Sequence, residues 1–302
     1  MAGGGGPGIS HWGAGGPRDP QPEETRSSKI LGPLRAEGAR GVVIATVSTV
    51  LVLVVIAIVI VNSTNWLLFK QTFFNGTLLR ETFPVILRAF VHNIEYFLIA
   101  EPLILALALL LAVMRSLPGS VFFPIRVMAI FYIDLFRGIP TILVVYLLGF
   151  GVPALQIPGL PNNAAFWGVV GLVLSYSAYV AEVYRAGIES VHPSQTAAAR
   201  SLGLSRWKTL RFVVVPQAVR RVVPPLMNDF IALQKDTALI AVVTGFPPEA
   251  FLQGQIFQAA DFNFTPIVGV ALCFLIITVP QTRLADWLVA RQRGKRQAGG
   301  PL

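Results

Sequence analysis

The chain has 302 residues, of which 54% are hydrophobic and only 13% are charged, whereas soluble domains carry roughly 25% charged residues. Several uninterrupted apolar runs reach the length of about 20 residues that a helix needs to cross hydrocarbon, which excludes a water-soluble globular protein. The net charge of +9 suits a membrane protein, because Lys and Arg accumulate in cytoplasmic loops. The sequence has no basic patch interleaved with aromatic residues, and this absence disfavours a nucleic-acid partner.

Cysteine and histidine usage argues against two kinds of site. The single cysteine, Cys273, lies inside an apolar run, so the chain cannot form an internal disulfide. The histidines His11, His92 and His192 are scattered and lack metal-ligand spacing. We therefore expect neither a metal ion nor another cofactor.

The first 41 residues are rich in Gly, Pro and charge, a composition that cannot bury enough apolar surface to fold. They predict a disordered cytoplasmic tail over 1–41. The first apolar run begins after this tail and lacks a small-residue cleavage site close behind it, so we do not expect a removable signal peptide. Residues 42–62 are predicted to be a transmembrane anchor, with its helix at 43–62.

Five further apolar segments follow the anchor and predict an all-α polytopic membrane protein with six transmembrane helices. Their expected ranges are 93–114, 122–150, 165–186, 222–245 and 264–289.

The distribution of positive charge predicts the orientation. Five Lys or Arg residues precede the first span and seven lie in 185–221, whereas the loops at 151–164 and 246–263 contain none. Four more follow the last span, in a cytoplasmic tail over 291–302. By the positive-inside rule both termini and the basic segment are cytoplasmic.

One loop disagrees with this rule. Lys70, Arg80 and Arg88 would lie outside, between the first two spans. The stretch FPVILRAF (83–90) within this loop could form an interfacial helix.

The basic segment that interrupts the apolar pattern predicts a helix, a sharp turn and a second helix. His192-Pro193-Ser194 resembles a helix start, and Gln195 to Leu202 reads as a short Ala-rich helix. Gly203 suits a left-handed stop, and Ser205 can cap a second helix that runs until Pro216 approaches.

The side chains of this segment favour a docking element. Small residues leave the first helix smooth, so a groove of another protein can approach closely. The second helix carries Leu204, Trp207, Leu210 and Val214 on one stripe, and leaves its basic residues free to meet water, phosphates or another protein. The alternative is an ordinary solvated basic loop.

The same residues resemble a known signature. Ala198-Ala199, then Gly203, then Val213-Val214-Val215-Pro216 have the spacing of the cytoplasmic loop of binding-protein-dependent ABC transporter permeases, E-A-A, three residues, G, nine residues, I-x-L-P. Ala197 replaces the Glu of that pattern. Three flanking stretches are similar to the polar amino acid branch, which carries histidine, glutamate, glutamine, arginine or opines: YIDLFRGIPTILVV, SAYVAEVYRAGIESV and VPQAVRRVVPPLMNDFIALQKDTAL.

The resemblance implies a five-helix permease core over 87–290, paired with a second permease subunit as a homodimer or heterodimer. It also implies two ATP-binding subunits and an extracellular solute-binding protein as partners, with segment 188–216 as the loop that couples to the ATPase. The coupling residues it implies are Ala197, Ala198, Ala199, Gly203, Leu204, Trp207 and Pro216.

Ionisable residues inside spans each need a partner or a watery cavity, because their insertion costs at least about 2.5 to 3.5 kcal/mol. Asp134 can pair with Arg137, and Glu182 with Arg185, since each pair is three residues apart on a helix. For a transporter of zwitterions, acidic groups could meet the ammonium of the substrate and a lysine its carboxylate; alternatively these groups only fix helix packing. The candidates for the substrate path are Glu101, Asp134, Glu182, Lys235 and Asp236.

The sequence favours one of three function classes. The leading hypothesis is the permease subunit of an ATP-driven amino acid importer in a bacterial plasma membrane. Since the sequence lacks a G-x-x-x-x-G-K-[ST] phosphate loop, hydrolysis would be carried out by a partner chain. A secondary transporter driven by an ion gradient would predict internal repeats, which are not seen. A membrane enzyme is disfavoured because Ser175 and Ser177 lack a histidine nearby in sequence and the usual hydrolase motifs are missing.

Overall fold

The computed structural model describes residues 38–243, 245 and 248–298. Residues 1–37 of the tail predicted over 1–41 and the last four residues of the chain lie outside this part, whereas residues 38–41 belong to a helix. Every regular element among the described residues is an α-, 3₁₀- or π-helix, which confirms the all-α fold class. Residues 1–67 and 68–302 form two units.

In the first unit, α2 (Gly38–Val61) is a mostly apolar helix, and the side chains of residues 41–61 are almost all exposed. Its hydroxyl groups bond their own helix: the Oγ1 atoms of Thr46 and Thr49 donate to the carbonyls of Val42 and Ala45 at 2.8 and 2.7 Å. Hydroxyls satisfied in this way can face hydrocarbon, because each of their donors is already bonded. By length and composition, 41–61 can cross a membrane.

The boundary between the two units falls within α3 (Trp66–Phe73), and the second unit continues with the long α4 (Gly76–Ser116). Asn75 caps α4 by accepting hydrogen bonds from the backbone N–H groups of Thr77 and Leu78 at 3.1 and 3.2 Å. At about 1.5 Å per residue, the 41 residues of α4 span roughly twice the hydrocarbon thickness. The stretch 83–90, expected to form a separate interfacial helix, is part of α4, because the helix continues without interruption into the predicted span at 93–114.

The predicted span at 122–150 is two helices. α5 (Phe123–Gly138) and α6 (Thr141–Ala154) meet at an angle of 99°. The break falls where Ile139 takes an extended conformation, φ −97° and ψ 130°, as the residue before a proline usually does. Pro140 therefore ends α5 and starts α6.

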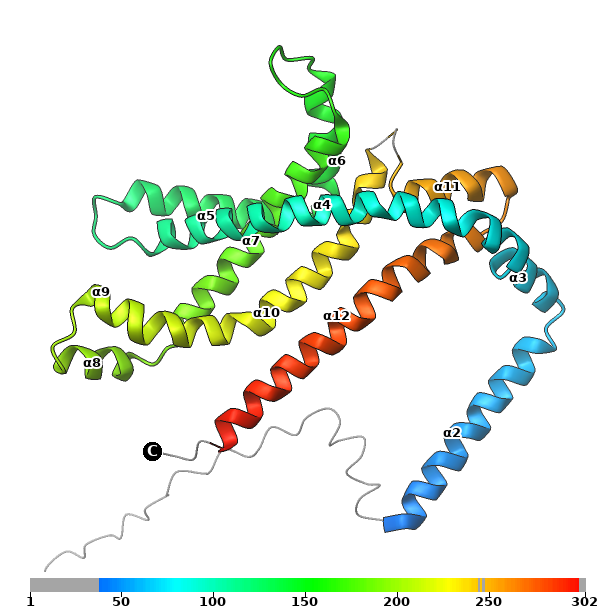
Figure 1. Cartoon of the computed structure of the whole chain (residues 1–302), viewed down its shortest axis with the longest axis horizontal. Helices are drawn as coiled ribbons and strands as arrows, with labels where there is room; N and C mark the ends of the chain where they lie inside the picture. The colour runs from blue at the N-terminus through cyan, green and yellow to red at the C-terminus, as the bar shows by residue number, and fades with distance from the viewer. Residues whose placement is uncertain (1–37, 244, 246–247, 299–302) are drawn as a thin grey trace, which may run out of the picture. The chain divides into compact units, whose positions relative to one another are not determined.

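The remaining elements continue the second unit (Figure 1). They are α7 (Ala164–Glu189), α8 (Pro193–Ser201), α9 (Arg206–Thr209), η1 (Leu210–Val214), α10 (Val215–Asp236), η2 (Thr237–Val242), α11 (Ala250–Asp261) and α12 (Thr265–Ala298).

Four described helices are long and apolar enough to cross a membrane, or five spans if α5 and α6 count as one bent span. The predicted count of six is therefore not confirmed. The predicted span at 222–245 corresponds to α10 and η2, and it is not among the four because Arg220, Arg221, Asp229, Lys235 and Asp236 make this stretch strongly charged.

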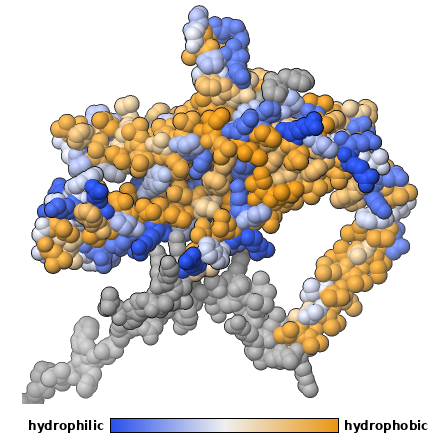
Figure 2. Space-filling model, in the orientation of Figure 1, coloured by the Kyte–Doolittle hydropathy of each residue, from blue (hydrophilic) through white to orange (hydrophobic). Residues whose placement is uncertain are grey.

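The core of the second unit centres on α7, which packs against α4, α5, α6 and α10. Buried Ile104, Ile133, Leu172 and Leu233 from four of these helices meet in one cluster. A second cluster joins α4 to α11 and α12, where the rings of Phe90 and Phe274 meet edge to face at 4.9 Å. Apolar residues cover much of the visible surface of this unit, as expected for a protein solvated by lipid (Figure 2).

Helices α7 and α10 approach closely at Gly187, where an added Cβ atom would overlap the Cγ1 atom of Val222. We expect Gly187→Ala to destabilise the core by about 1 to 3 kcal/mol, the usual cost of overpacking. Adding Val222→Ala removes the overlapping methyl and should restore most of that loss. Thermal unfolding of the three purified variants in detergent measures both effects; equal melting temperatures for Gly187→Ala and the parent would contradict the close approach.

Candidate docking segment and membrane path

Segment 188–216 folds as a short helix, a turn and a second helix, at the end of α7 (Figure 1). His192 caps α8: its Nδ1 atom accepts a hydrogen bond from the backbone N–H of Ser194 at 3.2 Å. Pro193 occupies the first turn, where its missing N–H has no partner to lose. The predicted start of the first helix is confirmed.

The turn depends on Gly203, which has φ +82°. Its N–H donates to the carbonyl of Arg200 at 3.0 Å, and the N–H of Leu204 donates to that of Ala199 at 3.2 Å. These bonds satisfy carbonyls at the end of α8 and require a left-handed residue. A Cβ atom at Gly203 would meet nothing within 4 Å in this chain. The backbone conformation, and not a steric clash within the chain, therefore favours glycine at this position.

The second helix begins as predicted but does not end near Pro216. Ser205 caps α9 by accepting from the N–H of Lys208 at 3.3 Å. The helix then passes through the π turn η1, in which the N–H of Val215 bonds the carbonyl of Leu210, and continues as α10. The wider π turn accommodates a proline that has no N–H to donate, so the prediction of a helix end was wrong.

Large apolar side chains in this segment face outward. Leu202, Trp207 and Phe212 are 83%, 67% and 64% exposed, whereas Val214 of the predicted stripe is buried. Ala197 and Ala198 are exposed and Ala199 is buried. Leu202, Trp207 and Phe212 thus leave apolar side chains exposed on a basic segment.

Glu182 is held by arginines on two helices. Arg185 donates to its Oε2 atom through Nε at 3.0 Å and Nη2 at 2.8 Å, which confirms the predicted pair. Arg115, at the end of α4, donates to the other carboxylate oxygen. Since both oxygens of Glu182 are occupied, its contacts favour a structural role that ties α4 to α7.

Replacing this carboxylate tests that role. Glu182→Leu strands Arg115 and Arg185 in a partly buried site, so we expect a loss of about 2 kcal/mol or more. Glu189→Leu removes the other carboxylate that is bonded to Arg185. Because the side chain of Glu189 is 61% exposed, this change should cost less than about 1 kcal/mol. Melting temperatures of the purified variants compare the two. A Glu182→Leu protein as stable as the Glu189→Leu protein would contradict the structural role.

The predicted pair of Asp134 and Arg137 does not form in the structure. Both side chains are exposed, and neither has an ion-pair partner within the described part of the chain. Arg137 instead lies over the ring of Tyr179, 5.9 Å from its centre.

The other predicted path residues gather around α10. Glu101 on α4 lies close enough to Asp229 on α10 for their charges to interact. The hydroxyl of Tyr176 on α7 donates to Asp236 at 2.8 Å, while Lys235 is exposed. None of these four charged residues has an ion-pair partner among the residues described.

Sequence reasoning missed Asp229 and Tyr176. The available signal was spacing: Asp229 and Asp236 are seven residues apart and so share a face of α10. One oxygen of Asp229 is buried without a hydrogen-bond partner. A buried acceptor without a partner is unusual in native proteins and often marks a functional position or a bound water.

A buried polar network was also missed. Glu249, fully buried, caps α11 by accepting from the N–H groups of Phe251 and Leu252 at 2.9 and 2.7 Å. Asn93 on α4 donates to Glu249 at 2.8 Å and to Thr237 at 3.2 Å, and accepts from the N–H of Ala250 at 3.0 Å. Burial raises the pKa of Glu249, while these hydrogen bonds act in the opposite direction. The network joins α4, η2 and α11.

Comparison with known proteins identifies the family. Residues 76–294 match the model of the binding-protein-dependent transport system inner membrane component. The chain therefore belongs to this family of transport proteins, whose members are the membrane subunits of ABC transporters and whose ATPase is a separate subunit.

Individual relatives agree with this assignment. The chain is 31% identical over 218 residues to the probable glutamine ABC transporter permease protein GlnM of Bacillus subtilis, covering 72% of this chain and 97% of the relative. It is 36% identical over 152 residues to the glutamine transport system permease protein GlnP of Escherichia coli, covering 50% and 68%. Among solved structures, an amino acid ABC transporter with histidines is similar, with a TM-score of 0.62, 31% identity and coverage of 69% of this chain and 94% of the other.

A methionine ABC transporter, MetNI in an inward-facing conformation, has a TM-score of 0.51 at 18% identity, covering 71% of this chain and 96% of the other. At that identity the similarity concerns the fold alone.

Proposed function

We propose that this chain is the permease subunit of an ATP-driven importer of a polar amino acid, and that segment 188–216 transmits the movement of a separate ATPase. The observation that carries the proposal is the turn at Gly203. It places the left-handed residue of the family's loop pattern between two capped helices, one of which presents the exposed ring of Trp207. An ordinary solvated loop has no need of such apolar exposure.

The partners follow from this role. The chain has no phosphate-binding loop of its own, so two ATP-binding subunits dock beneath a pair of permease subunits, either identical or different. An extracellular solute-binding protein delivers the substrate. The positive-inside rule supports cytoplasmic termini and a cytoplasmic docking segment in a bacterial inner or plasma membrane.

The path for the substrate runs along the polar face of α10. Glu101, Asp229 and Asp236 supply acceptors for an ammonium group, and Lys235 supplies a cation for a carboxylate. Asp134, exposed on α5, contributes if a second permease subunit packs against that helix. Similarity to proteins named as glutamine permeases supports an amino acid substrate.

Co-purification tests the docking role. The chain, expressed with the ATPase and binding protein encoded nearest to its gene, should retain the ATPase through detergent extraction, and ATP hydrolysis should require that subunit. The isolated chain should show no ATP binding at micromolar ATP. Binding of ATP by the isolated chain, or failure of every neighbouring ATPase to associate, would refute the proposal.

A further inference from the structure

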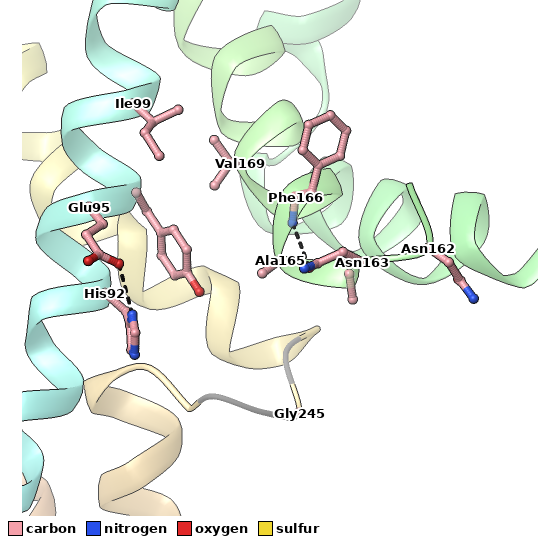
Figure 3. A pocket seen from close by; sticks show the side chains of 11 residues that line it. His92, Glu95, Ile99, Asn162, Asn163, Ala165, Phe166, Val169 and Gly245 are labelled. Carbon is pink, nitrogen blue, oxygen red and sulfur yellow. Dashed lines mark hydrogen bonds and ion pairs between the residues drawn. The ribbon is translucent and has the colours of Figure 1, made fainter. Parts of the chain in front are cut away.

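A cavity lies at the start of α7 (Figure 3), whereas the docking segment 188–216 follows the end of that helix. Its volume is about 580 Å³, within the range of about 300 to 1,000 Å³ usual for small-molecule sites. α4 lines one side with His92, Glu95 and Tyr96, and the first turn of α7 lines the other with Asn163 and Phe166. None of the path residues described above lines it.

The polar groups of the cavity divide into one carboxylate and several groups that can donate a hydrogen bond. Glu95 pairs with the Nδ1 atom of His92 at 3.0 Å through Oε2, which leaves its second oxygen open. The Oδ1 atom of Asn163 accepts from the N–H of Phe166 at 3.2 Å, which leaves its amide N–H₂ free to donate. The Nε2 atom of His92 and the hydroxyl of Tyr96 have no hydrogen-bond partner among the described residues.

This division matches the two charged groups that every free amino acid carries. A carboxylate such as Glu95 binds an ammonium group by charge-assisted hydrogen bonds. The amide of Asn163 sits at the start of a long helix, whose N-terminal dipole favours a carboxylate. Ile99 and Val169 supply an apolar wall beside these groups, as in most small-molecule sites.

We propose that this cavity is an outer subsite that binds the ammonium and carboxylate groups of a free amino acid, separately from the path along α10. The inference rests on the proposed function for the identity of its ligand. Glu95 holds the ammonium group, and Asn163 with Tyr96 holds the carboxylate. A substrate released at this end of the molecule meets the cavity before it reaches α10.

Binding is measured by saturation-transfer NMR with millimolar glutamine on the full chain in lipid nanodiscs, without ATPase or binding protein. The parent chain for these measurements carries Lys235→Met, which removes the carboxylate-binding cation of the α10 path, so that the signal reports the cavity. Two analogues are compared: N-acetylglutamine, which lacks the ammonium group, and 4-aminobutanamide, which lacks the carboxylate. Each analogue should bind at least about tenfold more weakly than glutamine, the effect of losing one hydrogen bond to a charged group.

The variants are matched to keep the fold. Glu95→Gln removes the charge that faces the ammonium group. Asn163→Asp keeps a good cap for α7 but replaces the amide donor by a carboxylate that repels the ligand. Each should weaken glutamine binding about tenfold or more, whereas Glu81→Gln, an exposed carboxylate of α4 outside the cavity, should leave it unchanged.

Three results would overturn the inference: no glutamine binding by the parent chain, analogues that bind as well as glutamine, or unchanged binding in both cavity variants. If the variants kept glutamine binding but lost the stimulation by the solute-binding protein, the cavity would be a protein-docking site and the inference would fall. ATP-driven uptake by the complete complex would leave the proposed function standing in each of these cases.

Discussion

Gly203→Asp should abolish the stimulation of ATP hydrolysis by substrate-loaded binding protein while the chain reaches the membrane at a normal level. Aspartate adopts the φ of +82° seen at Gly203 only at a cost of about 1 kcal/mol or more. It also places a negative side chain on the surface that would face the ATPase. The variant should either release the ATPase on co-purification or retain it with hydrolysis stimulated at least about tenfold less.

Gly119→Asp is the matched control for this experiment. Gly119 also has positive φ, +91°, and open space around its Cα atom, but it lies between α4 and α5 rather than in the docking segment. It should keep the stimulation. Equal losses in both variants would show that the defect comes from backbone strain in any turn and not from docking.

Glu249→Leu should cause the largest loss of stability of any single substitution considered for this chain, about 3 kcal/mol or more. The change removes one of the two acceptors of the Asn93 amide and strands the N–H groups of Phe251 and Leu252, in a site where Glu249 has no exposed surface. An unsatisfied buried donor costs about 1 to 3 kcal/mol. The melting temperature of the purified chain and its level in membranes measure the loss.

Glu249→Gln separates hydrogen bonding from charge. Its amide carbonyl can still accept from the N-terminus of α11, so most of the stability should remain. Glu81→Leu, an exposed carboxylate on α4, should change little. If Glu249→Leu were as stable as Glu81→Leu, the network joining α4, η2 and α11 would not hold these elements together.

The docking segment was predictable because its signals are local. A cap, a proline in the first turn and a glycine at the stop position act within a few residues, and His192, Pro193, Gly203 and Ser205 all take the places expected of them. The π turn before Pro216 has no local signal in the sequence, and the helix continues beyond it with Val214 and Ala218 packed against Val191.

Side-chain partners that lie far apart in the sequence were harder to predict. Spacing along one helix predicted the pair of Glu182 and Arg185 correctly, but gave no sign of Arg115, 67 residues away. The same spacing predicted a pair of Asp134 and Arg137 that does not form. Glu249 carries no periodic signal, because its side-chain partner is Asn93 on α4, 156 residues away. Side-chain partners on other helices are set by tertiary packing, which cannot be derived from spacing within a single sequence.

Uptake into proteoliposomes tests the central claim most directly. The chain, reconstituted with its ATPase and the solute-binding protein, is given radiolabelled glutamine and other polar amino acids, with ATP present or absent on the ATPase side. Proton and sodium gradients are collapsed by ionophores. Uptake of a polar amino acid that requires ATP hydrolysis and the binding protein, and that persists without gradients, is the predicted result. Uptake that follows an ion gradient and proceeds without the ATPase would contradict the account.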